Sequence, residues 1–225
     1  MAVKRMVILV EGDSELAFIK RMLIPQLYAR SEAKGISGWS IETCKIISNR
    51  KLQKKGGNIN YEYLYNDIER FTSQGCSVLT TFLDFFRLPN DFPGYTINGN
   101  QIHLVELAMK HDLKERIPHL PCFVPYIQKY EFEALLFSNM NGFNYLIDDA
   151  KILEALNKIT EQYTNPEDIN GGQDTAPSKR LMALFNYNKT ADSIEMLKKI
   201  GFDTIYARCP RFSNWFDCLC SLIID

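Results

Sequence analysis

The strongest constraint on the fold is a short, uninterrupted apolar run near the start of the chain. Residues 6–10 read MVILV, and the run stops abruptly at Glu11, at the start of the segment EGDSE. Continuous β-branched runs of this length are typical of a central parallel strand that is buried on both faces. Gly12 gives the chain a tight exit, and Ser14 is placed to cap a helix whose apolar residues follow at helical spacing. Glu11 is therefore expected at the carboxyl end of a central strand, where open α/β sheets bind their ligands.

The same arrangement of apolar run and acid recurs twice. Residues 77–83 read SVLTTFL and end at Asp84, and residues 122–127 read CFVPYI and precede the acids of the segment YEFE. Pro125 in the second run favours an edge strand or a bulge, because proline cannot donate to a ladder. Each run predicts a strand whose carboxyl end lies close to an acidic side chain.

The order of these patterns predicts the fold class. A strand over 39–47 and helices over 61–71 and 101–116 complete a βαβαβαβα order. This order indicates an α/β domain over residues 1–139, with a mainly parallel four-stranded sheet flanked by helices. Residues 140–225 show only helical patterns and are expected to form a helical C-terminal subdomain packed on that domain; the patterns cover residues 148–163, 177–187, 190–199 and 211–223.

Composition excludes several classes of protein. A hydrophobic fraction of 46% supplies a core for the 225 residues, and a net charge of −1 provides no global field that would attract nucleic acid. The six cysteines are scattered without a CxxC pair, which favours reduced, buried thiols. The run ending at Glu11 is too short for a signal peptide, and no stretch reaches the ~20 apolar residues of a membrane span. We therefore expect a cytoplasmic protein that does not enter the membrane.

The acids at the three strand ends predict a cation site. In a parallel sheet these ends share one edge, and like charges that converge there repel one another unless protons or a cation compensate them. Mg²⁺ or Mn²⁺ is the natural partner of such oxygen ligands. The candidate metal ligands are Glu11, Glu15, Asp84, Glu131 and Glu133. Each acid also has a simpler interpretation: a solvated side chain after a strand, or a first-turn acid favoured by the helix dipole.

Five motifs give the chain a resemblance to a known family. They are VEGDSE (10–15), LDFFRLPNDFPG (83–94), YEFEALLF (130–137), TAPSKRL (175–181) and CPRFSNW (209–215). The first two resemble the Toprim domain of topoisomerases, primases and OLD-type nucleases. Taken together, the five resemble an uncharacterised bacterial Toprim-like family that is encoded beside AAA-type or ABC-type ATPases in phage-defence islands.

The resemblance implies roles for individual residues. Glu11 would be the Toprim glutamate, a metal ligand or general base, and Asp84 a direct metal ligand. The second Asp of the Toprim Asp-x-Asp motif falls at position 86, where this chain has Phe86. Two-metal cleavage of a phosphodiester then requires another oxygen, and Glu131 or Glu133 is expected to supply it.

Basic residues provide candidates for binding phosphate. TAPSKRL places Ser178, Lys179 and Arg180 near a predicted helix start, where Pro177 suits the first position and backbone N–H groups favour an anion. An ordinary capped helix with solvated basic residues is the alternative. The basic, glycine-rich loop 49–58 includes Lys54 and Lys55, which are candidates for tracking a nucleic-acid backbone, although a solvated charge run also explains them.

Two functional hypotheses follow. The first is a Mg²⁺- or Mn²⁺-dependent nuclease that cuts DNA or RNA as the effector of an anti-phage defence module with an ATPase partner. Its expected catalytic residues are Glu11, Asp84, Glu133 and Lys179. The second is a non-catalytic Toprim-like subunit that binds or regulates an ATPase complex, which Phe86 and the near-neutral charge favour. The sequence leaves homo-oligomer formation open.

Overall fold

The structure is a computed structural model that describes residues 3–49, 54–56, 59–86, 88–169, 172 and 174–224. It divides into two compact units. Unit 1 comprises Met1–Ile127 and Leu219–Asp225, and unit 2 comprises Gln128–Cys218. Each unit is described by itself below.

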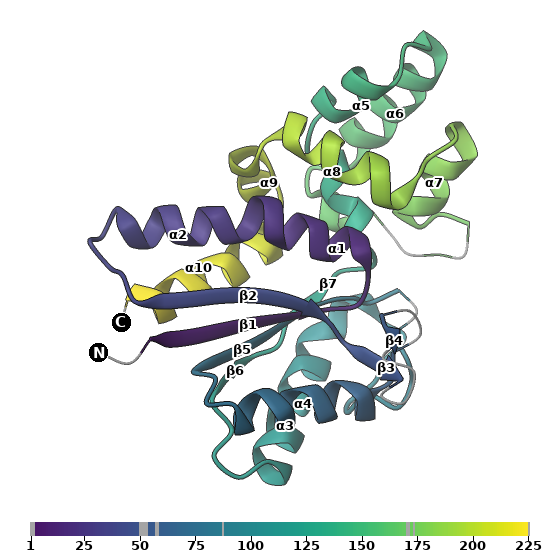
Figure 1. Ribbon diagram of the computed structural model, residues 1–225. Helices are drawn as coiled ribbons and strands as arrows, with labels where there is room; N and C mark the ends of the chain where they lie inside the picture. The colour runs from purple at the N-terminus through teal and green to yellow at the C-terminus, as the bar shows by residue number, and fades with distance from the viewer. Residues whose placement is uncertain are drawn as a thin grey trace. The chain divides into compact units, whose positions relative to one another are not determined.

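Unit 1 is built on a five-stranded sheet. The strands run in the order β2-β1-β5-β6, and β7 pairs with β5 off this path (Figure 1). The pairs β1–β2, β1–β5 and β5–β6 are all parallel, as the sequence predicts. The strand bounds are β1 Lys4–Val10, β2 Trp39–Lys45, β5 Val78–Asp84, β6 Cys122–Val124 and β7 Ile127–Gln128.

The two central strands are buried, which explains their continuous apolar sequences. Residues 6–10 of β1 are inaccessible to solvent, and every residue of β5 is buried. Two polar residues of β5 fit this interior because their hydroxyls donate to backbone carbonyls: Thr80 to Val124 and Thr81 to Tyr126. The prediction of central parallel strands at both positions is confirmed.

Helices cover both faces of this sheet. In Figure 1 the first helical segments and the end of α10 lie on one face, and α3 and α4 lie on the other. The first segment runs through α1, a π-helical turn η1, and α2. A short antiparallel hairpin, β3–β4, follows β2. The bounds are α1 Asp13–Phe18, η1 Ile19–Leu23, α2 Ile24–Glu32, β3 Ile47–Asn49, β4 Lys54–Lys55, α3 Tyr61–Ser73, η2 Gly99–Gln101 and α4 Ile102–Arg116.

Unit 2 is helical and is organised around one buried segment. All seven residues of the 3-10 helix η3 are buried, and η3 contacts α6, α7, α8, α9 and η4. An aromatic cluster from α9 and α10 adds to the core, with the rings of Phe202 and Phe216 4.9 Å apart. The bounds are η3 Phe132–Ser138, α5 Asn141–Leu146, α6 Ala150–Gln162, η4 Pro166–Asp168, α7 Pro177–Leu184, α8 Lys189–Ile200, α9 Phe202–Arg208 and α10 Pro210–Ile224.

Several boundaries differ from the sequence-based expectation. The segment YEFEALLF belongs to unit 2, so the division falls after Ile127 and not after residue 139, and residues from Leu219 return to unit 1. The expected strand over 122–127 is interrupted at Pro125 into β6 and β7, since proline cannot extend the ladder. The first helix starts at Asp13 with Gly12 at its N-cap, so Ser14 lies inside the helix and does not cap it.

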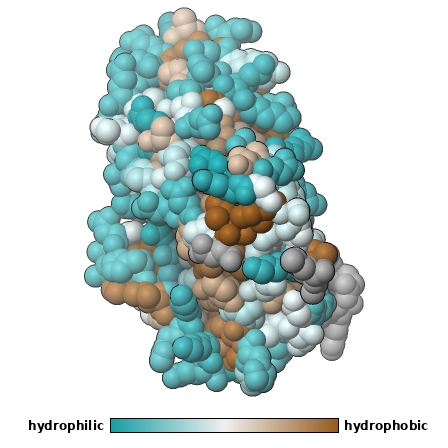
Figure 2. All heavy atoms as spheres, turned by 90° about the vertical axis from the view of Figure 1, so that its left-hand side faces the viewer, coloured by the Kyte–Doolittle hydropathy of each residue, from teal (hydrophilic) through white to brown (hydrophobic). Residues whose placement is uncertain are grey.

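Two further features concern membrane-spanning helices and the exposed surface. No helix in the described part of the chain is long and apolar enough to cross a membrane. The face in Figure 2 is largely hydrophilic with several apolar spots. Exposed large apolar side chains in unit 1 include Ile97 and, on α4, Leu104 and Leu107.

Candidate active site at the sheet edge

Glu11 and Asp84 lie at the carboxyl ends of two neighbouring strands. β1 and β5 are parallel, and Val10 pairs with Phe82. Asp84 is thus two residues beyond the last pair, and Glu11 one residue beyond it. Because adjacent strands lie about 4.8 Å apart, the register brings the two acidic positions to the same edge of the sheet, as the sequence predicts.

The side chain of Asp84 belongs to the face of the sheet that α1 covers. Side chains alternate along a strand, so Asp84 shares a face with Phe82. The Phe82 ring packs 5.9 Å from the ring of Phe18 on α1. Asp84 is only 9% exposed. A carboxylate buried this far is unusual for a simple solvated strand end.

Glu15 is buried close to the point where the chain leaves β1. It lies in the first turn of α1 and is 3% exposed. A Cβ atom added to Gly12 would lie 2.5 Å from Oε2 of Glu15, so the carboxylate folds back against the glycine. Gly12 therefore makes room for a buried acid in addition to turning the chain. Asp13, the other acid of this turn, instead accepts a 2.7 Å bond from Nζ of Lys45.

The hairpin after β2 returns to the end of β1. Gly56 donates its N–H to the carbonyl of Ile46, and its own carbonyl accepts from the hydroxyl of Ser48. Gly56 has a φ of +74°, and a Cβ atom there would lie 2.5 Å from the carbonyl oxygen of Glu11. Gly56 is thereby held against the end of β1. The side chains of Lys54 and Lys55, the candidate phosphate ligands of the basic loop, lie outside the described residues.

In unit 2, two predicted site residues bind each other. Glu131 accepts a 2.8 Å bond from the backbone N–H of Ser178 at one carboxylate oxygen, and a 2.9 Å bond from the Ser178 hydroxyl at the other. Both residues are buried. Ser178 follows Pro177 at the start of α7, so Glu131 satisfies an N–H group that the helix itself leaves without a partner. Each oxygen of Glu131 thus accepts one hydrogen bond from Ser178.

The remaining candidates of unit 2 are arranged separately. Oε1 of the fully buried Glu133 lies 3.4 Å from Nζ of Lys189. Arg180 donates a 2.7 Å bond from Nε to the carbonyl of Thr175. Lys179 is half-buried, and its side chain makes no hydrogen bond or ion pair with any described residue.

The predicted metal ligands thus fall into two sets. Glu11, Glu15 and Asp84 belong to unit 1, whereas Glu131 and Glu133 belong to unit 2. Within the described residues, no group of three or more His, Cys, Asp or Glu side chains is placed to hold a metal ion. The acids of unit 1 therefore provide the candidate site.

A comparison with known protein families matched nearly the whole chain. A family model described as a domain of unknown function (DUF4276) matches residues 10–219. The chain belongs to the DUF4276 family. Searches of curated proteins and of solved structures gave no match.

The region shared with the DUF4276 family contains a buried acid that the sequence analysis missed. Glu167 is inaccessible to solvent and accepts N–H bonds from Arg211 at 2.8 Å and Phe212 at 3.1 Å. Burial raises the pKa of Glu167, although these two N–H bonds act in the opposite direction. Glu167 caps the start of α10, much as Glu131 caps α7. The sequence holds no local signal for this role, because the partners lie more than 40 residues away along the chain.

Proposed function

We propose that this DUF4276 protein is a Toprim-like, metal-dependent phosphodiesterase that cuts DNA or RNA. The observation that supports it best is the pairing of β1 with β5, whose carboxyl ends carry Glu11 and Asp84. The proposed role is that of effector in an anti-phage defence module with an ATPase partner, acting in the cytoplasm. These finer points rest on the family resemblance of the motifs.

The donors at this edge suit a hard cation. Mg²⁺ keeps several waters and commonly uses one or two protein carboxylates together with substrate phosphates. Glu11 and Asp84, with Glu15 buried beside the same turn, provide carboxylates of this kind. A donor set smaller than three is therefore compatible with Mg²⁺ or Mn²⁺. The cation, when bound, would supply positive charge for the charge that develops on the phosphate.

The side chains have separate tasks in this proposal. Asp84 and Glu11 would hold the cation, and a Glu11 carboxylate oxygen would take a proton from the attacking water. Gly12 leaves space for the Glu15 carboxylate, which lies in the first turn of the helix that follows Glu11. Lys179 and Arg180, at the start of α7 in unit 2, are proposed to contact the nucleic-acid backbone.

A nuclease assay tests the proposal. The protein would be incubated with plasmid, single-stranded DNA and total RNA in Mg²⁺, Mn²⁺ or EDTA. Cutting should require the metal and should fall at least about 100-fold in Glu11→Gln and in Asp84→Asn. Glu154→Gln is a matched control, because Glu154 is an exposed residue of α6 that pairs with Lys158.

Binding of Mn²⁺, followed by electron paramagnetic resonance, provides a readout that does not depend on a partner. The proposal expects binding in the natural protein and in Glu154→Gln, with clear weakening in Glu11→Gln and Asp84→Asn. Cutting that persists in EDTA or in both acid variants would contradict the proposal. Failure to bind Mn²⁺ would contradict it as well.

Two observations favour a second candidate, a non-catalytic Toprim-like subunit of an ATPase complex. Both oxygens of Glu131 are bonded to Ser178, and Phe86 stands where the Toprim motif has its second acid. With Phe86 in place of an acid, the chain has one metal ligand fewer than the Toprim nucleases that it resembles. This candidate expects neither Mn²⁺ binding nor cutting, and it expects Glu11→Gln to leave association with the ATPase unchanged.

A further inference from the structure

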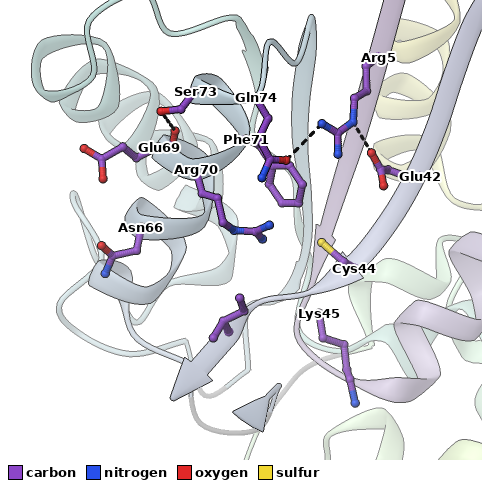
Figure 3. A pocket seen from close by; sticks show the side chains of 11 residues that line it. Arg5, Glu42, Cys44, Lys45, Asn66, Glu69, Arg70, Phe71, Ser73 and Gln74 are labelled. Carbon is purple, nitrogen blue, oxygen red and sulfur yellow. Dashed lines mark hydrogen bonds and ion pairs between the residues drawn. The ribbon is translucent and has the colours of Figure 1, made fainter. Parts of the chain in front are cut away.

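Unit 1 contains a pocket of about 800 Å³ that extends as far as Lys45 and Ile47, at the carboxyl end of β2 and in β3. Its walls come from β1, β2 and β3 on one side and from the last three turns of α3 on the other (Figure 3). Arg5, near the start of β1, lies about 20 Å along the strand from Glu11. The volume is in the range of small-molecule sites.

Two arginines share one aromatic ring in this pocket. The guanidinium carbon of Arg5 lies 5.3 Å from the centroid of the Phe71 ring, and that of Arg70 lies 4.0 Å from the same centroid. Phe71 is only 4% exposed, so it is a fixed platform for both. Cation–π contacts of this kind restrain both planar guanidiniums relative to the same ring.

Each guanidinium is also held by a carboxylate. Nε of Arg5 pairs with Glu42, and Nη1 of Arg5 donates a 3.2 Å bond to the side chain of Gln74. Nε and Nη2 of Arg70 both donate to Oδ1 of Asp67, at 3.2 and 3.0 Å. Asp67 is itself buried, and its other oxygen accepts the N–H of Ile47. The two arginines are therefore oriented before any ligand binds.

Each guanidinium has one nitrogen whose N–H groups take no part in these bonds. Nη2 of Arg5 and Nη1 of Arg70 have no hydrogen-bond partner among the described residues. In Figure 3 the guanidinium of Arg70 points from α3 toward the sheet, and that of Arg5 lies between Glu42 and Gln74. Guanidinium N–H groups pair best with the oxygens of carboxylates and phosphates.

We propose that this pocket binds a small molecule through one oxyanion group, a phosphate or a carboxylate, held between Arg5 and Arg70. The polar side chains of Asn66, Ser73 and Gln74 line the pocket and suit hydrogen bonds to the rest of such a molecule. Arg5 and Arg70 disfavour a bare metal cation there. The proposed oxyanion group binds at Arg5 and Arg70, and its binding does not depend on the proposed nuclease chemistry.

Calorimetric titration with defined probes tests the site. Inorganic phosphate and adenosine monophosphate represent the phosphate class, and citrate represents the carboxylate class. At least one class should bind, with affinity at least about tenfold weaker in Arg5→Gln and in Arg70→Gln. Lys110→Gln makes the same charge change at an exposed position of α4 and should bind like the natural protein.

Cys44 gives a local readout of occupancy. It lines the pocket, and its sulfur points from β2 toward α3 (Figure 3). In a background with the exposed Cys122 and Cys218 changed to Ser, the probe that binds should slow maleimide labelling of Cys44 several-fold. Peptide mapping would assign the labelled cysteine.

A second variant keeps the test valid if an arginine variant unfolds. Ser73→Trp fills the pocket from an exposed position of α3 and leaves both arginine networks in place. It should melt like the natural protein and lose binding. Three results would each overturn the proposal: no probe binds, binding survives in Ser73→Trp, or binding leaves Cys44 labelling unchanged.

Discussion

Gly56 shows how one residue shapes the candidate site. Its positive φ and the nearby carbonyl of Glu11 leave no room for a side chain. The position therefore fixes how closely the backbone after β4 approaches the end of β1. From the sequence, the pair of glycines at 56 and 57 predicts only a loop, because the atom that demands glycine belongs to a residue 45 positions earlier.

Gly56→Ala should destabilise the protein more than Gly75→Ala. Gly75 has a φ of +73°, close to that of Gly56, but a Cβ atom there would have no neighbour within 4 Å. Both variants should lose roughly 1–2 kcal/mol of unfolding free energy from left-handed backbone strain. Gly56→Ala should lose more, because its Cβ also meets the Glu11 carbonyl. Urea denaturation measures both losses, and equal values would contradict the clash.

The sequence predicts where some acidic residues lie in the fold, but it does not predict the hydrogen-bond partners of their side chains. Glu11 and Asp84 follow apolar runs that only buried strands explain, so their place at the sheet edge was predictable. Glu131 looked similar, but each of its oxygens accepts a hydrogen bond from Ser178, 47 residues away. A sequence without structure shows which acids are near strand ends and does not show which of them already have partners.

At the scale of elements, distant carboxylates cap two helices of unit 2. Glu131 caps α7, and Glu167 caps α10. The motifs YEFEALLF and TAPSKRL, which the sequence analysis assigned to chemistry, are thus joined to each other by structural bonds. The start of α7 was predictable from Pro177, and the start of α10 from its apolar pattern. The carboxylates that cap these two helices were not predictable.

Glu131 and Ser178 should show strong coupling in a double-mutant cycle. Glu131→Gln and Ser178→Ala should each cost about 1–2 kcal/mol of unfolding free energy, because each weakens the same buried cap. The double variant should cost clearly less than the sum of the two. Denaturation curves measure the cycle, and Glu154→Gln should be indistinguishable from the natural protein. Additive losses would contradict a shared cap.

Glu167 should make stability depend on pH. Burial raises its pKa, so between its unfolded and folded values the folded chain binds more protons than the unfolded chain. Stability should therefore fall as pH rises through that window. Glu167→Gln keeps an acceptor for α10 and should flatten this part of the pH profile. Urea denaturation between pH 4 and about 7 tests this, and an unchanged slope in Glu167→Gln would contradict it.

At the scale of the whole molecule, the chain leaves unit 1 after Ile127 and returns at Leu219. The shift from alternating strands and helices to helices alone predicted two parts. The return was not predictable, because α10 is one continuous apolar helix whose sequence does not change where it passes from unit 2 to unit 1. Only the contacts of its last residues reveal the change.

Ile223 should matter to unit 1 far more than its neighbour Ile224. Ile223 is 2% exposed, and its carbonyl accepts a 3.1 Å bond from the indole N–H of Trp39 at the start of β2. Ile224 is 38% exposed. Ile223→Ala should cost about 2–5 kcal/mol of unfolding free energy, through lost burial and the cavity left behind, and Ile224→Ala much less. Denaturation compares the two losses.

Hydrogen exchange then tests which unit loses stability in Ile223→Ala. If the end of α10 completes the core of unit 1, Ile223→Ala should speed exchange of backbone amides in β1 and β2, since these strands and the helix end share that core. Ile224→Ala should leave those amides protected and thereby controls for general effects at the helix end. Faster exchange confined to the helices of unit 2 would show instead that residues from Leu219 onward stabilise that unit, and that the core of unit 1 is complete without them.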